Sequence, residues 1–228
     1  MLPEIKPKFQ SFKFENNETF SFRGWNISDE LNFDKTNILS FISNCMINPE
    51  QDLERLKKLD SIDVYRLLLE IRKQSKANKI AFSFDCIDDE KCKTVNDAEF
   101  DLSIDIKFTN KEIENIETDE VLYNFKNLSI DEDISFLEKC KDIKDIQSLI
   151  IQRIIFSINY VIVEGIKYDN FTIDEMEKWF LKRPIDEKNI IMKQFEKTQK
   201  KLQLEKMCRC AICGKEKLTK AGLDFLLL

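Results

Sequence analysis

The chain has 228 residues, of which 43% are hydrophobic and 34% are charged, and its formal net charge is −6. This composition is typical of a globular protein and argues against a general nucleic-acid binder. There is no histidine and only four scattered glycines, which excludes imidazole-based catalysis, His-containing zinc sites and glycine-rich phosphate loops. The chain must therefore act by binding, or through its seven cysteines.

The N-terminal region predicts a β-hairpin followed by helices. Phenylalanines alternate with polar residues on both sides of an Asn-Asn-Glu turn, at Phe12, Phe14, Phe20 and Phe22. Ser28 is expected to cap a short helix. Apolar residues at helical spacing predict further helices over residues 38–46, 53–59 and 61–72.

The middle of the chain changes from helical to strand periodicity. Apolar residues alternate with polar ones from Ile80 to Phe84, and again, without a break, from Phe100 to Phe108. Strict alternation is typical of a half-buried strand. Each of these stretches therefore predicts one strand, joined by a polar stretch over residues 87–96. A weaker strand is expected over residues 121–125.

The second half is predicted to be mainly helical. Helices are expected over Asp131–Cys140 and, as one long buried element, over Ile146–Val163. Thr172 and Glu175 have capping-box spacing and open a helix over Met176–Leu181. Pro184 permits a new helix, which is expected to carry Ile190, Ile191, Phe195 and Leu202.

These elements predict an α+β fold: a helix-rich body with an N-terminal β-hairpin and a small antiparallel sheet that carries a zinc-ribbon-like pair of cysteine knuckles. Four segments are expected to form one compact unit. Residues 1–78 hold the hairpin and helices, and residues 79–130 the strand-knuckle-strand sheet. Residues 131–205 are helical, and residues 206–228 form a C-terminal cysteine knuckle that returns to the sheet.

Two cysteine pairs carry the possible chemistry of the chain. Cys210 and Cys213 lie in a Cys-x-x-Cys-Gly-Lys sequence, in which two thiolates converge on one ion and the glycine relieves the tight backbone. Cys86 and Cys92 lie at the mouth of the predicted strand pair. Together they predict a closed structural Zn²⁺ site with four thiolate ligands, flanked by basic side chains at Lys91, Lys93, Lys206, Arg209 and Lys215.

Other interpretations of the cysteines stay open. Cys208 could share in the ligation with Cys210 and Cys213, or all the cysteines could be free thiols on a docked tail. Redox chemistry is disfavoured, because no βαβ unit surrounds the Cys-x-x-Cys sequence. Cys45 and Cys140 are expected to be structural thiols of the core.

Localisation and charge limit the kinds of partner that the chain can have. No signal peptide is visible, and Gln152, Arg153 and Asn159 interrupt the most apolar stretch, so the chain is expected to be cytoplasmic. A reducing compartment favours metal over disulfides. Residues 188–220 carry a net charge of +7, which suits an acidic partner or supplies counter-charge for thiolates.

The order of features resembles a known family. Arg23-Gly24-Trp25 follows the hairpin, Leu59-Asp60 precedes Tyr65-Arg66-Leu67-Leu68, and Ile71-Arg72-Lys73-Gln74-Ser75 leads into a strand. After the C-terminal knuckle comes Gly222-Leu223-Asp224-Phe225. This order is similar to that of the baseplate hub assembly proteins and hub subunits of T4-like (T-even) bacteriophages and related contractile-tailed phages.

The resemblance implies a late viral tail protein that builds the central hub of the baseplate. Its partners would be other hub or tail proteins in the host cytoplasm during assembly, and the resemblance does not imply whether the chain stays in the virion tail baseplate. Neither a small-molecule substrate nor a membrane is expected. No set of nucleophile, base and orienting group is present, so an enzyme is not expected. The alternative is a zinc-ribbon nucleic-acid-binding or transcription-related module, which the basic C-terminal segment favours and the net negative charge disfavours.

Overall fold

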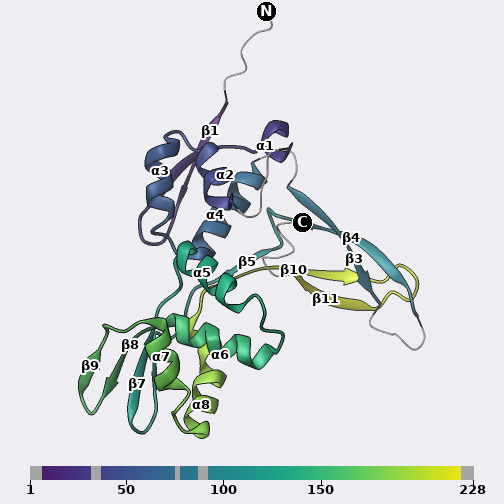
Figure 1. The fold of residues 1–228 in the computed structure, drawn as a ribbon. Coiled ribbons are helices and arrows are strands. Elements are labelled where there is room, and N and C mark those ends of the chain that lie inside the picture. Colours follow the sequence, from purple (N-terminus) through teal and green to yellow (C-terminus); the bar gives the residue numbers. More distant parts are fainter. Residues whose placement is uncertain (1–6, 32–36, 75–77, 87–91, 222–228) are drawn as a thin grey trace, which may run out of the picture. The chain divides into compact units, whose positions relative to one another are not determined.

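A computed structural model describes residues 7–31, 37–74, 78–86 and 92–221, and it has the predicted α+β class (Figure 1). The chain divides into two compact units. The first consists of Met1–Leu56, Ile62–Phe108 and Leu202–Leu228, and the second of Lys57–Ser61 and Thr109–Lys201. In sequence, both segments of the second unit therefore lie between segments of the first, and the long one, Thr109–Lys201, is inserted between Phe108 and Leu202. The four-segment division made from the sequence stays a prediction.

The first unit begins with the predicted hairpin. Strands β1 (Phe9–Lys13) and β2 (Thr19–Arg23) pair antiparallel, with Phe12 opposite Phe20. Helices α1 (Ile27–Leu31), α2 (Ile38–Asn44), α3 (Pro49–Leu56) and α4 (Ser61–Lys73) follow. The hairpin and the helices around residues 38–46 and 61–72 are thus confirmed.

The cap predicted at Ser28 is wrong, because Asn26 takes that position. The Asn26 side chain accepts a hydrogen bond from the Asp29 backbone N–H at 3.0 Å. In return, the Asp29 carboxylate accepts from the Asn26 backbone N–H at 2.8 Å. This reciprocal pair gives acceptors to two backbone N–H groups at the helix start that have no partner within the helix. Ser28 lies inside the first turn.

The strand predicted over residues 100–108 is two strands separated by a turn. Strand β4 (Val95–Asp101) pairs with β3 (Lys79–Asp85), and β5 (Ile106–Thr109) belongs to another sheet. Between them the Asp101 carboxylate accepts from the Ser103 N–H, and the Asp105 carboxylate from the Asp101 N–H, at 2.8 and 2.7 Å. The aspartates that alternate with apolar residues therefore build a turn, as Asp side chains often do.

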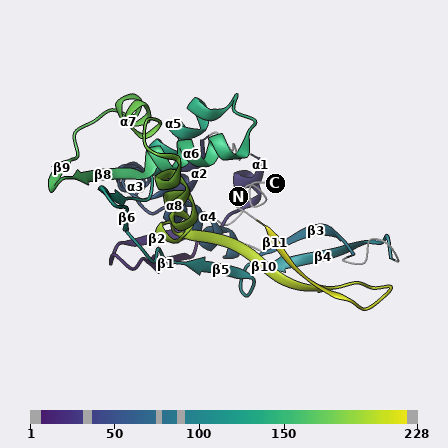
Figure 2. The same ribbon diagram turned by 90° about the horizontal axis from the view of Figure 1, so that it is seen from below.

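The C-terminal part of the first unit is a second hairpin, of β10 (Lys201–Arg209) and β11 (Glu216–Ala221). Strand β10 also pairs with β5, which gives the order β11-β10-β5. In both views this hairpin lies beside the β3–β4 hairpin (Figures 1 and 2). Residues from α4, β3, β4, the turn after β4 and β10 form their shared core: Leu69, Ile80, Phe100, Leu102, Leu202 and Leu204.

Leu202 does not belong to the helix after Pro184. That helix, α8 (Ile185–Phe195), ends seven residues before Leu202 and is followed by a short 3₁₀ turn over Glu196–Thr198. Leu202 is buried in β10 instead, where Leu202 and Leu204 alternate with partly exposed residues. Its apolar side chain fits either periodicity, which explains the wrong prediction.

The second unit is a four-stranded antiparallel sheet with helices. The strand order is β6-β7-β8-β9, from β6 (Asn115–Glu117), β7 (Val121–Phe125), β8 (Ile158–Val163) and β9 (Ile166–Tyr168). The helices are α5 (Ile130–Cys140), α6 (Ile146–Ser157), α7 (Ile173–Phe180) and α8. Strand β7 and helix α5 are confirmed, and so is the Thr172–Glu175 capping box of α7.

The long helix predicted over Ile146–Val163 is wrong in its last third, Ile158–Val163. Helix α6 ends at Ser157, and Ile158 already has strand dihedrals. The residues that follow pair with β7 on one side and β9 on the other. They include three β-branched residues, Val161, Ile162 and Val163, which favour a strand.

The core of the second unit contains a buried polar network. The Tyr123 hydroxyl donates to the Glu187 carboxylate, which also binds the Arg183 guanidinium at 2.8 Å. Tyr123 is fully buried, and burial is the largest of the causes that raise its pKa above the usual range. Helices α6, α7 and α8 supply the apolar residues around it, among them Ile154, Phe180 and Ile191.

None of the helices within the described ranges is both long and apolar enough to cross a membrane.

Candidate metal centre

The two predicted cysteine pairs lie at the ends of two neighbouring hairpins of the first unit. Cys86 directly follows β3, and Cys92 precedes β4. Cys210 directly follows β10, and Cys213 lies in the turn that leads into β11. The β3–β4 pairing and a backbone hydrogen bond of 3.0 Å from the Cys86 N–H to the Thr94 carbonyl close the first knuckle.

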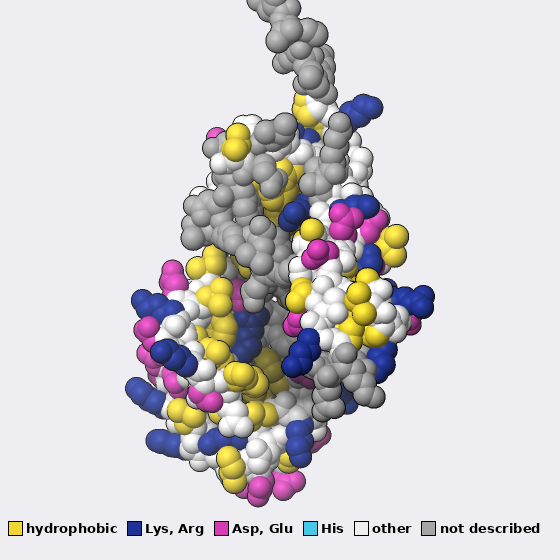
Figure 3. All heavy atoms as spheres, turned by 90° about the vertical axis from the view of Figure 1, so that its right-hand side faces the viewer, with side chains coloured by type: hydrophobic (Ala, Val, Ile, Leu, Met, Phe, Trp, Pro, Cys, Tyr) yellow, Lys and Arg dark blue, Asp and Glu magenta, His cyan; other side chains and the backbone are white. Residues whose placement is uncertain are grey.

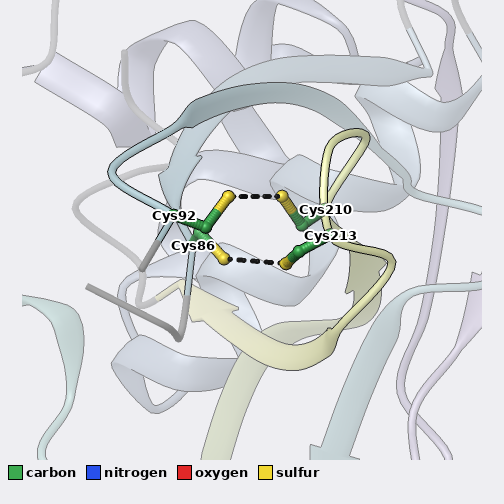
Figure 4. Close-up of side chains that lie close together, drawn as sticks. All are labelled: Cys86, Cys92, Cys210 and Cys213. Atoms are coloured by element: carbon green, nitrogen blue, oxygen red, sulfur yellow. Dashed lines mark hydrogen bonds between the residues drawn. The ribbon is translucent and has the colours of Figure 1, made fainter. Parts of the chain in front are cut away.

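The four sulfur atoms converge on one point, as Figure 4 shows. The Sγ atoms of Cys86 and Cys213 are 3.4 Å apart, and those of Cys92 and Cys210 are 3.7 Å apart. All four lie within 4.8 Å of one another. Four thiolates around Zn²⁺ have Zn–S distances near 2.3 Å, which places the sulfurs of a regular tetrahedron about 3.8 Å apart. The residues present therefore fit a tetrahedral metal ion.

The C-terminal knuckle has the backbone conformation that its sequence predicts. Gly214 has φ +73°, in the left-handed region that favours glycine. The Gly214 N–H donates to the Cys210 carbonyl at 3.0 Å, and the Cys210 N–H to the Lys215 carbonyl at 2.9 Å. The Arg209 guanidinium lies against Gly214 and donates to its carbonyl at 3.1 Å. A side chain at Gly214 would crowd this guanidinium.

This knuckle stabilises the thiolate form of Cys210. Hydrogen bonds from the backbone N–H groups of Cys213 and then Ile212 lower the pKa of Cys210 to about 6. Hydrogen bonding to the charged form of a group favours that form. By contrast, burial raises the pKa of Cys45 to about 11, which is typical of a core thiol. Only a thiolate binds a metal ion well.

Asn96 joins the two knuckles, and the sequence analysis did not identify it. The Asn96 side chain is 7% exposed. Its Nδ2 lies 3.6 Å from the Cys210 Sγ, and its Oδ1 accepts from the Ala211 N–H at 2.9 Å. The available signal was a polar residue at an inward position of β4, on the same face as Phe100.

The other cysteines lie outside the convergent group. Among the described residues, that group contains only Cys86, Cys92, Cys210 and Cys213. Cys208 is buried in β10, two residues before Cys210. Cys45 and Cys140 are buried in the first and second unit, respectively.

The basic residues expected around the cluster have different roles. Lys206 donates to the Glu99 carbonyl and lies 3.4 Å from the Asp105 carboxylate. Arg209 binds the knuckle backbone. Lys93 is exposed, and Lys91 lies outside the described residues.

The comparisons with known proteins agree with the resemblance of the sequence. The family model described as "T4 bacteriophage base plate protein" matches residues 8–226. No curated protein and no solved structure matches the chain. The match covers nearly the whole chain, including all four convergent cysteines. The chain therefore belongs to the T4 bacteriophage base plate protein family.

Proposed function

We propose that this chain is an assembly or structural protein of the baseplate hub in a contractile phage tail. It acts through contacts with other hub or tail proteins and not through catalysis. The family match over residues 8–226 carries this proposal. Its setting is the host cytoplasm during assembly, with a place in the virion tail baseplate.

The proposal includes one structural Zn²⁺ ion held by Cys86, Cys92, Cys210 and Cys213. Their convergence within 4.8 Å supports a metal ion, and an all-sulfur ligand set favours zinc over magnesium or calcium. Four protein ligands fill a tetrahedral ion and leave no position for a substrate. The ion would fasten the β3–β4 hairpin to the β10–β11 hairpin, so its contribution is stability.

The helices α5 and α6 offer a surface for protein contacts. Ile134 and Leu137 are three residues apart on α5, and Ile146 and Ile150 are four apart on α6, so each pair shares one side of its helix. These side chains are between 38% and 72% exposed. Figure 3 shows apolar side chains at the surface among charged ones. Exposed apolar patches rimmed by polar residues mark sites of protein contact.

The basic C-terminal segment is largely occupied within the chain, which weighs against the nucleic-acid alternative. Lys200 pairs with Asp60 at 2.6 Å, and Lys220 with Glu205 at 2.7 Å. Lys217 donates to the Asp85 carbonyl at 3.3 Å. Lys and Arg contacts to phosphate supply most of the non-specific affinity for nucleic acid, and these three lysines have acceptors within the chain with which phosphate would compete.

Co-purification with the other hub proteins of the same phage tests the function. The tagged wild type is expected to retain at least one of them, and a Leu137→Glu, Ile150→Glu double variant is expected to retain less. An Ile166→Glu, Tyr168→Glu double variant places the same two charges on exposed residues of β9 and serves as the control. If the wild type captures no tail protein, the proposal is wrong. Salt-dependent binding of duplex DNA would favour the alternative.

A further inference from the structure

The carboxamide of Asn96 is hydrogen-bonded through both its nitrogen and its oxygen between the two cysteine knuckles. Its Nδ2 has two donors, which point to the Thr94 carbonyl at 3.2 Å and to the Cys210 Sγ at 3.6 Å. Its Oδ1 accepts from the Ala211 N–H at 2.9 Å. The reversed amide would place an oxygen against the sulfur and an NH₂ group against an N–H, so these contacts determine its orientation.

On this basis we infer that Asn96 is a positioning residue of the metal centre, one that donates an N–H···S hydrogen bond to the Cys210 thiolate. The inference rests on the zinc site proposed above and adds a residue to it. The bond withdraws electron density from this sulfur and fixes its direction toward the ion. Such outer-shell partners orient the ligands of metal sites and tune them.

The position of Asn96 supports this role over a purely structural one. It belongs to β4, whereas its partners Cys210 and Ala211 belong to the C-terminal knuckle, 114 and 115 residues further along the chain. One side chain thus sets the distance between the knuckles and contacts a ligand atom. A residue that only joined the knuckles would need the Ala211 contact alone.

The Asn96→Asp variant separates the two roles. Aspartate has nearly the same shape and still accepts from the Ala211 N–H, but it has no donor for the sulfur or for the Thr94 carbonyl and brings a negative charge to the thiolate. The variant is expected to bind Co²⁺ about 10- to 100-fold more weakly than the wild type. Its sulfur-to-cobalt charge-transfer band is expected to shift to longer wavelength, because the sulfur electrons are less stabilised. Wild-type affinity and an unshifted band would overturn the inference.

Asn124→Asp is the matched control. Asn124 is also 7% exposed, and its carboxamide bonds Asn115 and Asn159 in the second unit. This variant is expected to lose stability but keep the cobalt affinity and spectrum. An equal shift of the cobalt band in both variants would contradict a specific role for Asn96.

A measurement on the wild type covers the case in which the Asp variant does not fold. In protein loaded with the spin-active cadmium isotope, the Asn96 side-chain amide proton is expected to show scalar coupling to the metal through the sulfur. Absence of this coupling in the cadmium-loaded protein would refute the hydrogen bond. A wild type that binds neither cobalt nor cadmium would instead refute the zinc site itself, so the two failures are distinguishable.

Discussion

Removal of the metal is expected to destabilise the first unit while the second unit stays folded. The reason is that the four ligands all belong to the first unit and come from two segments, one before and one after the inserted second unit. A chelator stronger than the site removes the ion and leaves the covalent chain unchanged. The lost stability is then the contribution of the cross-link.

The magnitude follows from the loop that the ion closes. Cys92 and Cys210 are 118 residues apart, and closing a loop of this length in the unfolded chain corresponds to about 5 kcal/mol. If the second unit remains folded, the flexible part shrinks to about 25 residues, between Cys92 and Phe108 and between Leu202 and Cys210, which corresponds to about 3.5 kcal/mol. For a unit of this size, the lower value shifts the melting temperature by on the order of 10 °C.

The two tryptophans make the assay specific for each unit. Trp25 belongs to the first unit and packs on Phe41, with 4.6 Å between ring centroids. Trp179 belongs to the second and contacts Tyr123 at 6.0 Å. Single-tryptophan variants, Trp25→Phe and Trp179→Phe, are melted with zinc and with excess chelator. The transition reported by Trp25 is expected to shift down, and that reported by Trp179 to stay in place.

A Trp25 transition that does not move on chelation refutes the cross-link. Equal shifts of both transitions would show that the units unfold together, which contradicts the shorter loop. A Cys213→Ser protein is the control, since chelator is expected to change neither of its transitions.

Three further predictions concern single residues. Cys210→Ser is expected to lose the metal whereas Cys208→Ser keeps it, as atomic absorption of the purified proteins will show. Gly214→Ala is expected to cost about 1–2 kcal/mol in urea unfolding because of its positive φ, and to weaken zinc binding as well through the crowded guanidinium. Gly165→Ala, also at positive φ, has nothing within 4 Å of the added carbon and is expected to destabilise without touching the metal. Tyr123→Phe removes the donor to a buried carboxylate and is expected to cost about 1–3 kcal/mol of the second unit's stability.

Each of these has an outcome that contradicts it. Full metal content in Cys210→Ser would exclude Cys210 as a ligand. Loss of the metal from Cys208→Ser would show that Cys208 is a ligand. Equal zinc affinities of Gly214→Ala and the wild type would mean that the knuckle tolerates the crowding. A Tyr123→Phe protein as stable as the wild type would mean that the Tyr123 hydroxyl adds no stability to the buried Arg183–Glu187 ion pair.

The sequence predicted those elements in which periodicity and end signals agree. Helix α7 has a capping box at Thr172 and an amphipathic pattern, and the structure confirms both. The run from Ile146 to Val163 is largely apolar, and the polar residues that interrupt it, among them Gln152, Arg153 and Asn159, follow no period that separates helix from strand. Its last third becomes a strand because β7 and β9 are available to pair with it. Whether these partner strands are available depends on the tertiary structure and cannot be read from the residues of the run itself.

In the candidate site, too, some residues could be identified from the sequence and one could not. The four cysteines were identified from their residue type, since thiolates at knuckle spacing have few other uses. Asn96 has no such signature, because an amide in a strand acquires its role only through the register that places it opposite Phe84 and toward Cys210. The aspartates at 101 and 105 misled for the opposite reason. Their alternation fitted a strand, whereas their side chains close a turn.

The insertion of the second unit between the ligand pairs has a consequence for biosynthesis. The ribosome completes Cys86 and Cys92 early, and the whole second unit, through Lys201, emerges before Cys210 and Cys213. The inserted unit can fold while the first still lacks β10 and β11. A chain that stops short of the last knuckle holds half a ligand set. A metal ion held by all four cysteines would therefore be bound only after Cys213 has been synthesised, when the inserted unit is already complete.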